Sequence, residues 1–168
     1  EIKNLWFGYS NSNRDVIQDL SFEIEEGEKV FFEGGSGSGK STLVRVLTGE
    51  LMPTDGEVIF KGLSLAQFSS RELYDYIRII DQNTYYMNIS VREFLKMAKQ
   101  SASDDEMKQV CMAVNLWEDL ETKTGGLETF IGENGSNLSK GQRQKLALAR
   151  LLVSKNKILI LDEAFSAI

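Results

Sequence analysis

Hydrophobic and polar residues alternate near the start of the chain with the two-residue period of half-buried strands. Leu5, Phe7 and Tyr9 form one such series, and Phe22 and Ile24 form another. Because side chains of a strand alternate between its two faces, each series predicts a strand with one face against a core. The beginning of the chain is therefore expected to be rich in β-structure.

The pattern then changes from strand to loop to helix. Residues 29–32 are a short apolar run that predicts a strand, and this run leads directly into a glycine-rich stretch. After that stretch, hydrophobic residues continue at helical spacing: Leu43, Val44, Val46 and Leu47. A turn at residues 53–56 comes before the next predicted strand, residues 57–60.

From about Ser69 onward, three helix starts carry a serine followed three residues later by a glutamate, which lets the two residues satisfy each other's backbone N–H groups. The pairs are Ser69/Glu72, Ser90/Glu93 and Ser103/Glu106. Residues 78–80 predict a further strand, and Ile158–Leu161 is a continuous apolar run typical of a strand buried on both faces of a parallel sheet. Strands alternating with helices predict an α/β protein.

Composition excludes several classes of protein. The chain has 168 residues, 42% of them hydrophobic, so it can bury a core. Its net charge of −6 argues against nucleic acid as the main ligand. It contains no histidine, so carboxylates must supply acid–base chemistry, and its single cysteine, Cys111, cannot form an intrachain disulfide. No apolar run reaches the length of a membrane-spanning helix.

The glycine-rich stretch matches the phosphate-binding pattern G-x-x-x-x-G-K-[ST] between a predicted strand and a predicted helix. Its residues are Gly34, Gly35, Ser36, Gly37, Ser38, Gly39, Lys40, Ser41 and Thr42. Glycines let backbone N–H groups close around phosphate oxygens, and a helix N-terminus adds positive potential. Lys40 is expected to reach the β- and γ-phosphates, and Ser41 to offer its hydroxyl to Mg²⁺. The alternative is a flexible glycine/serine turn.

Two carboxylates follow the last predicted strand, at the end where open α/β sheets bind ligands. Asp162 is expected to hold Mg²⁺, directly or through a water, and Glu163 to polarise a water for attack on the γ-phosphate. Taken alone, two acids after a strand are often a solvated turn. Together with the phosphate loop, they predict a second nucleotide-binding element.

A helix with a capping box is predicted to begin at Ser139. The pair Ser139 and Gln142 fits the capping pattern, and Gly141 allows close approach to the backbone. This pattern fits an ordinary N-cap equally well, and it also fits a helix N-terminus that binds an anion.

The order and spacing of these motifs resemble the nucleotide-binding domain of ABC transporters over nearly the whole chain. The resemblance rests on the phosphate loop, then LSKGQRQ at residues 138–144, then ILILDEAFSA at residues 158–167. It implies that Ser139, Lys140, Gly141 and Gln142 form the signature that contacts ATP bound to a second subunit. It therefore implies a head-to-tail dimer of nucleotide-binding domains, with ATP and Mg²⁺ at each interface.

The resemblance assigns roles to further residues. Tyr9 stands at the position of the aromatic residue that packs against adenine, and an ordinary strand aromatic is the alternative. Gln82 matches the glutamine that contacts Mg²⁺ or the attacking water. Residues 129–135, with Glu133 as the acid, match the segment that exporters use against their membrane part. Transmembrane domains, in the same chain or a separate subunit, are thus expected partners at the cytoplasmic face of a membrane.

Two departures from the family pattern affect these expectations. Lys140 replaces the first glycine of the signature pair, which adds a positive charge near the phosphate site. The sequence ends at Ile168, before the family's following aspartate and phosphate-sensing histidine. From this the chain is expected to be truncated after the second Walker element, and to turn over ATP poorly as given.

The predicted fold is a P-loop NTPase: a RecA-like core with a mostly parallel sheet, an N-terminal antiparallel β part and a helical subdomain. Residues 1–82 and 155–168 are expected to form the core with the β part, and residues 83–154 the helical subdomain. The predicted function is ATP hydrolysis that drives transport. The alternatives are a soluble ABC-type ATPase of translation or DNA repair, and a nucleotide-gated regulatory module without turnover. The transported substrate cannot be read from these residues.

Overall fold

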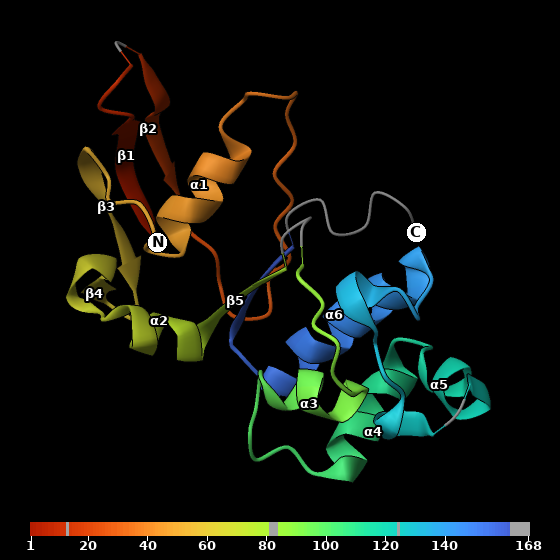
Figure 1. The fold of residues 1–168 in the computed structure, drawn as a ribbon. Helices are drawn as coiled ribbons and strands as arrows, with labels where there is room; N and C mark the ends of the chain where they lie inside the picture. Colours follow the sequence, from red (N-terminus) through yellow and green to blue (C-terminus); the bar gives the residue numbers. More distant parts are fainter. Residues whose placement is uncertain (13, 81–83, 124, 162–168) are drawn as a thin grey trace. The chain divides into compact units, whose positions relative to one another are not determined.

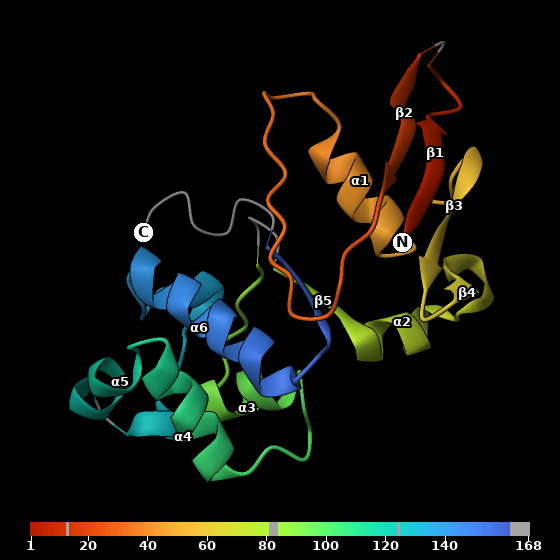
Figure 2. The same ribbon diagram turned by 180° about the vertical axis from the view of Figure 1, so that it is seen from behind.

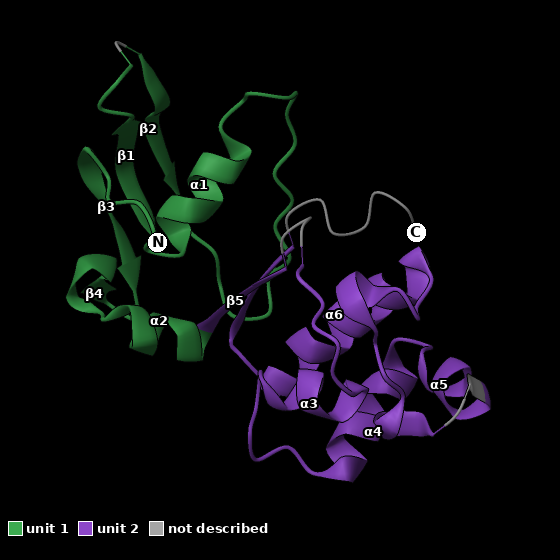
Figure 3. Cartoon of the chain, in the orientation of Figure 1, with its two compact units in different colours: residues 1–76 green, residues 77–168 purple. Residues whose placement is uncertain are grey.

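A computed structural model describes residues 1–12, 14–80, 84–123 and 125–161. The chain divides into two compact units, Glu1–Tyr76 and Ile77–Ile168 (Figure 3). The boundary between these units falls after Tyr76. The predicted grouping of residues 1–82 with 155–168, around a helical subdomain at 83–154, stays a prediction. No helix of the described residues is long and apolar enough to cross a bilayer.

The first unit is built on an antiparallel sheet with the strand order β2-β1-β3-β4 (Figure 1). Its strands are β1 (Ile2–Gly8), β2 (Asp15–Phe22), β3 (Asp55–Phe60) and β4 (Leu63–Ser64). The alternating pattern of β1 buries Leu5 and Phe7, as one-face burial requires, and Ile2, which a register shift separates from Leu5, is buried as well. This sheet confirms the predicted N-terminal antiparallel part.

Three short helical segments complete the first unit: α1 (Lys40–Leu47), the 3₁₀ segment η1 (Leu65–Gln67) and α2 (Ser70–Tyr76). Helix α1 buries Leu43 and Val46, which confirms the predicted apolar face. Helix α2 starts with the predicted reciprocal pair, because the Ser69 backbone N–H donates to Glu72 Oε2 at 2.8 Å and the Glu72 N–H donates to Ser69 Oγ at 3.3 Å.

The predicted strand at residues 29–32 is wrong. The segment has no regular secondary structure, and Phe31 is 85% exposed. A strand is stabilised by hydrogen bonds to a neighbouring strand as well as by apolar side chains. Among the described residues of this unit, the sheet consists of β1, β2, β3 and β4, and residues 29–32 have no strand partner there.

The second unit is mainly helical (Figure 2). Its helices are α3 (Val91–Lys96), α4 (Asp104–Ala113), α5 (Trp117–Lys123) and α6 (Lys140–Ser154), with 3₁₀ segments η2 (Gly126–Glu128) and η3 (Glu133–Gly135). Phe94, Met107, Leu116 and Leu146 are fully buried in one core that joins these helices. The predicted capping boxes at Ser90 and Ser103 are both present.

Strands β5 (Ile77–Ile80) and β6 (Ile158–Leu161) pair in parallel, in the register Ile77 to Ile158 through Ile80 to Leu161. The two strands and their parallel pairing agree with the sequence pattern. The expected burial of both faces of β6 is wrong, because Leu159 and Leu161 are 43% and 47% exposed. Within this unit Ala147 and Leu151 of α6 pack against Ile80, whereas β6 is the end strand of a two-stranded sheet.

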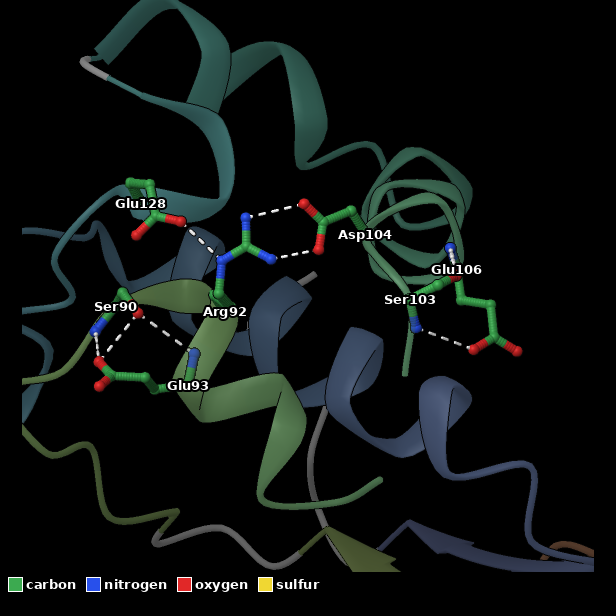
Figure 4. A network of polar contacts seen from close by, with 7 residues as sticks. All are labelled: Ser90, Arg92, Glu93, Ser103, Asp104, Glu106 and Glu128. Carbon is green, nitrogen blue, oxygen red and sulfur yellow. Dashed lines mark hydrogen bonds and ion pairs between the residues drawn. The ribbon is translucent and has the colours of Figure 1, made fainter. Parts of the chain in front are cut away.

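Arg92 joins three segments of the helical unit (Figure 4). Its guanidinium makes a two-pronged ion pair with Asp104 at the start of α4, and its Nε donates to Glu128 of η2 at 2.6 Å. These bonds raise the pKa of Arg92 and lower that of the Asp104 carboxyl. Because Arg92 itself lies in α3, the network ties α3, α4 and η2 together.

Candidate nucleotide-binding site

The phosphate loop ends where α1 begins, as the sequence pattern predicts. Lys40 is the first residue of α1, and Gly39 before it has left-handed backbone angles, with φ of 93°. No side chain caps this helix start among the described residues. The first amides of α1 therefore lack a side-chain acceptor at the end where the helix dipole is positive, and this arrangement suits an anion.

The backbone of the loop requires glycine at a specific position. A Cβ on residue 39 would lie 3.0 Å from Val16 Cγ1 and 3.2 Å from the Val16 carbonyl oxygen, in a conformation that L-residues rarely adopt. Gly37 also has positive φ, at 80°, but a Cβ there would meet open space. Gly39 thus lets the chain turn sharply against β2, whereas the surroundings of Gly37 stay accessible.

The Lys40 ammonium folds back over the loop. Its Nζ donates to the carbonyl oxygens of Gly34 at 2.5 Å and Gly35 at 3.0 Å. Ser38 Oγ lies 3.5 Å from the same nitrogen. A lysine ammonium carries three donors, so these contacts hold the positive charge directly above the glycine-rich backbone. Ser36 and Ser41 are exposed on the same loop and helix start.

Tyr9 lies beside the phosphate loop. Its hydroxyl is 3.2 Å from Oγ1 of the buried Thr42, and its ring meets Phe7 edge-on at 5.0 Å between centroids. Tyr9 is 40% exposed, so part of its side chain is accessible to a ligand. The structure thus brings the predicted adenine-packing residue together with the end of the loop within one unit. Whether the ring packs on adenine stays a prediction.

The predicted signature forms the start of α6. Ser139 Oγ accepts from the Gln142 N–H at 3.2 Å, and the Ser139 N–H donates to Gln142 Oε1 at 3.0 Å, which completes the capping box. Ser139, Lys140 and Gly141 are exposed, and a Cβ on Gly141 would meet nothing within 4 Å. The first turn contains no acidic residue. This helix start therefore presents a positive, open surface.

The segment 129–135, which precedes the predicted signature, is hydrogen-bonded to the start of α3. Ile131 is fully buried and its N–H donates to the Ile89 carbonyl at 2.9 Å, whereas Phe130 and Glu133 are exposed. The Val91 N–H donates to the Thr129 carbonyl at 3.0 Å. These bonds fix the segment to the start of α3, with its exposed residues directed away from the core.

Two residues that connect these parts were missed by the sequence analysis. The Tyr86 hydroxyl donates to the Arg143 carbonyl at 2.7 Å, and the Arg143 guanidinium donates to the carbonyls of Gly135 and Leu138. Burial raises the pKa of Tyr86 to about 12, although Arg143 and Arg150 oppose the shift. Tyr86 could be noticed in the sequence only as an aromatic residue with a hydroxyl group. Nothing in the nearby sequence indicated that this hydroxyl would bond to Arg143, 57 residues away.

Three predicted site residues, Gln82, Asp162 and Glu163, lie outside the described residues. Their proposed roles rest on the sequence pattern.

The comparisons with known proteins agree with the motif order. A family model described as "ABC transporter" matches residues 17–166. The chain belongs to the ABC transporter family. The fold of this chain matches the structure of a bacterial Atm1-family ABC exporter with ATP bound, with a TM-score of 0.91, 31% identity, and coverage of 99% of this chain and 29% of that chain.

Two curated relatives show the range of this ABC transporter group. A probable multidrug resistance ABC transporter ATP-binding/permease protein of Bacillus subtilis is 35% identical over 96% of this chain. An ATP-dependent lipid A-core flippase of Chromobacterium violaceum is 38% identical, also over 96%. The chain spans 28% of the length of each relative. Family and fold together confirm the predicted P-loop NTPase fold and the predicted ABC ATPase domain.

Proposed function

We propose that this ABC domain binds ATP and hydrolyses it to drive transport across a membrane in an exporter-like assembly. The observation that carries the proposal is the helix start at Lys40, where a left-handed glycine, an uncapped N-terminus and a lysine ammonium converge. This combination matches the charge and shape of a triphosphate. The ABC family match over residues 17–166 favours ATP as the ligand and transport as the process.

The loop and Tyr9 would divide the binding of ATP between them. Lys40 and the amides of residues 34–42 offset the phosphate charge, and the exposed face of Tyr9 packs against the adenine. Thr42 supports this arrangement because it joins the loop's end to the Tyr9 hydroxyl. The loop alone would bind any nucleoside triphosphate, so Tyr9 supplies contact with the base.

The residues available for Mg²⁺ have the chemistry that this ion prefers. Ser41 presents an exposed hydroxyl in the first turn of α1, and Gln82 and Asp162 add amide and carboxylate oxygens. Mg²⁺ held by these residues would supply positive charge that offsets the charge of the β- and γ-phosphates. Asp162 would hold it directly or through a water.

Glu163 would accept a proton from the attacking water, with Gln82 orienting that water. The chain has no histidine, so a carboxylate is the available general base. A second copy, arranged head to tail, would bring Ser139, Lys140, Gly141 and Gln142 to the ATP held by the first. The open start of α6 supports this assignment, since its amides and Lys140 present positive potential outward.

The partner of the assembly would be a transmembrane domain, in the same polypeptide or in a separate subunit. The printed name of the Bacillus subtilis relative combines ATP-binding and permease parts, which supports this arrangement. Segment 129–135, with Phe130 and Glu133 exposed, would meet that partner at the cytoplasmic face of the membrane.

Nucleotide binding by Lys40→Ala in the intact protein tests the proposal. Loss of an ammonium that contacts phosphate removes charge-assisted hydrogen bonds of about 1.5–3 kcal/mol, so ATP affinity should fall at least about tenfold. Lys29→Ala is the matched control, because Lys29 is an exposed lysine outside the loop. Titration with a fluorescent ATP analogue gives both affinities. Equal affinities for wild type and Lys40→Ala would contradict the proposed site.

A further inference from the structure

The capping box at Ser139 and Gln142 is local, so it shapes the first turn of α6 without orienting that turn in the unit. Orientation comes from more distant contacts. Leu138 is buried at 4% exposure just before the helix, and the Tyr86 hydroxyl binds the Arg143 carbonyl at 2.7 Å. A carbonyl oxygen has two lone pairs, so the Arg143 oxygen can accept this bond in addition to its helical one.

Tyr86 is itself held on several sides. It is 8% exposed, and its ring stacks on the fully buried Phe94 with centroids 5.4 Å apart and an interplanar angle of 18°. Its carbonyl accepts from the Asn134 N–H at 3.0 Å. Two aromatic χ angles locked by packing leave the hydroxyl little freedom, so its single hydrogen bond has a defined direction.

Arg143 closes this arrangement into a ring. Its Nη1 donates to the Gly135 carbonyl at 3.2 Å and to the Leu138 carbonyl at 3.1 Å. The chain then passes from Gly135 to Asn134, whose N–H returns to Tyr86. Gly135 has φ of 75°, and a Cβ there would press on the Arg143 side chain. This circuit of hydrogen bonds therefore has no room for a larger residue at position 135. Tyr86 is thus tied to the distant stretch 134–143, which contains the first turn of α6.

We propose that Tyr86 is a positioning residue for ATP hydrolysis: its hydroxyl fixes the first turn of α6 so that Ser139 and Gly141 meet the ATP held by a second copy. This inference rests on the proposed function, in which that helix start acts across the dimer. A helix N-terminus favours an anion only over its first turn, so a small change of angle removes the contact. Burial raises the pKa of the Tyr86 hydroxyl to about 12, so at neutral pH the hydroxyl is protonated and can donate.

The test compares Tyr86→Phe with Tyr85→Phe in the intact protein. Tyr86→Phe removes one oxygen and keeps the ring that stacks on Phe94. The neighbouring Tyr85 is 68% exposed, so Tyr85→Phe makes the same chemical change without touching α6. We expect Tyr86→Phe to lower kcat about 10- to 100-fold, as a displaced contact of about 1 Å does, while ATP binding to the Lys40 loop stays at the wild-type value. Tyr85→Phe should match wild type.

Hydrogen–deuterium exchange supplies the second readout. In Tyr86→Phe the backbone amides of residues 140–147 should exchange faster than in wild type, whereas those of α4 should not change. A merely structural role would lower the unfolding temperature and weaken ATP binding together with kcat. The inference is overturned if Tyr86→Phe keeps the wild-type kcat, or if kcat falls without faster exchange in residues 140–147. A wild-type protein that hydrolyses no ATP would instead contradict the proposed function, and the exchange experiment separates that result from this one.

Discussion

At the residue scale, the site residues that sequence could predict are those whose partners are near in the chain. Gly39 and Lys40 belong to one continuous loop, and Ser139 and Gln142 are three residues apart, so a local pattern contains both members of each interaction. Tyr86 and Arg143 are 57 residues apart, and their bond is made through a backbone carbonyl that any residue would supply. No side-chain pattern could have indicated it.

Gly39→Ala tests the backbone requirement of the phosphate loop. A non-glycine residue in the left-handed region costs about 1–2 kcal/mol, and the new methyl would also press on Val16. If the loop relaxes to relieve this strain, its amides leave their binding positions, so ATP affinity should fall about 5- to 30-fold. Isothermal titration of the intact protein with ATP measures the change.

Gly27→Ala is the control for that measurement. Gly27 has nearly the same backbone angle, φ of 85°, but a Cβ there meets nothing within 4 Å and the residue lies outside the loop. Its ATP affinity should equal that of wild type. A normal affinity for Gly39→Ala would show that the loop tolerates a side chain at this position.

At the scale of elements, helices were predicted more reliably than strands for a physical reason. A helix makes its backbone hydrogen bonds within itself, and several helix starts in this chain are marked by a local serine, as at Ser90 and Ser103. A strand needs a neighbour. In the part of the chain that the structure describes, residues 29–32 pair with no strand of their unit despite their apolar composition. There β6 has one strand neighbour, β5, and Leu159 and Leu161 are exposed.

Glu106 joins the start of α4 to the end of α6. Its carboxylate accepts from Lys99 at 2.8 Å and from Lys155 at 2.7 Å. The bonds from Lys155, Lys99 and the Ser103 amide lower the pKa of Glu106 from 4.5 to about 2. A carboxyl whose pKa is lower in the folded state stabilises the fold above its unfolded pKa. The contribution is therefore complete above pH 4.5 and is lost as the pH falls from 4.5 towards 2.

Glu106→Gln should accordingly remove part of the acid sensitivity of the protein. Thermal unfolding at pH 6 and at about pH 3 gives the loss of stability on acidification for each variant. Wild type should lose more than Glu106→Gln over this interval, and the exposed Glu121→Gln, which lacks such an ion pair among the described contacts, should behave as wild type. Equal losses for wild type and Glu106→Gln would exclude a stabilising role for this carboxylate.

At the scale of the whole molecule, the ABC family explains why the two units carry different parts of one proposed site. The phosphate loop and Tyr9 belong to Glu1–Tyr76, and the signature helix belongs to Ile77–Ile168. The phosphate loop and the start of α6 are each formed by residues close together in the chain, so both could be predicted from the sequence. Their proposed meeting across two copies would depend on surfaces that exist only in the assembly, so family resemblance can suggest it but local physics cannot derive it.

ATP hydrolysis by Glu163→Gln in the intact protein tests the central claim most directly. The amide keeps the size of the carboxylate but cannot accept the water's proton, so the steady-state rate should fall about 10²- to 10⁴-fold while ATP still binds. Glu121→Gln, the same change on an exposed helix residue, should keep the wild-type rate. Wild-type turnover by Glu163→Gln would contradict the assignment of the base and the hydrolysis mechanism built on it.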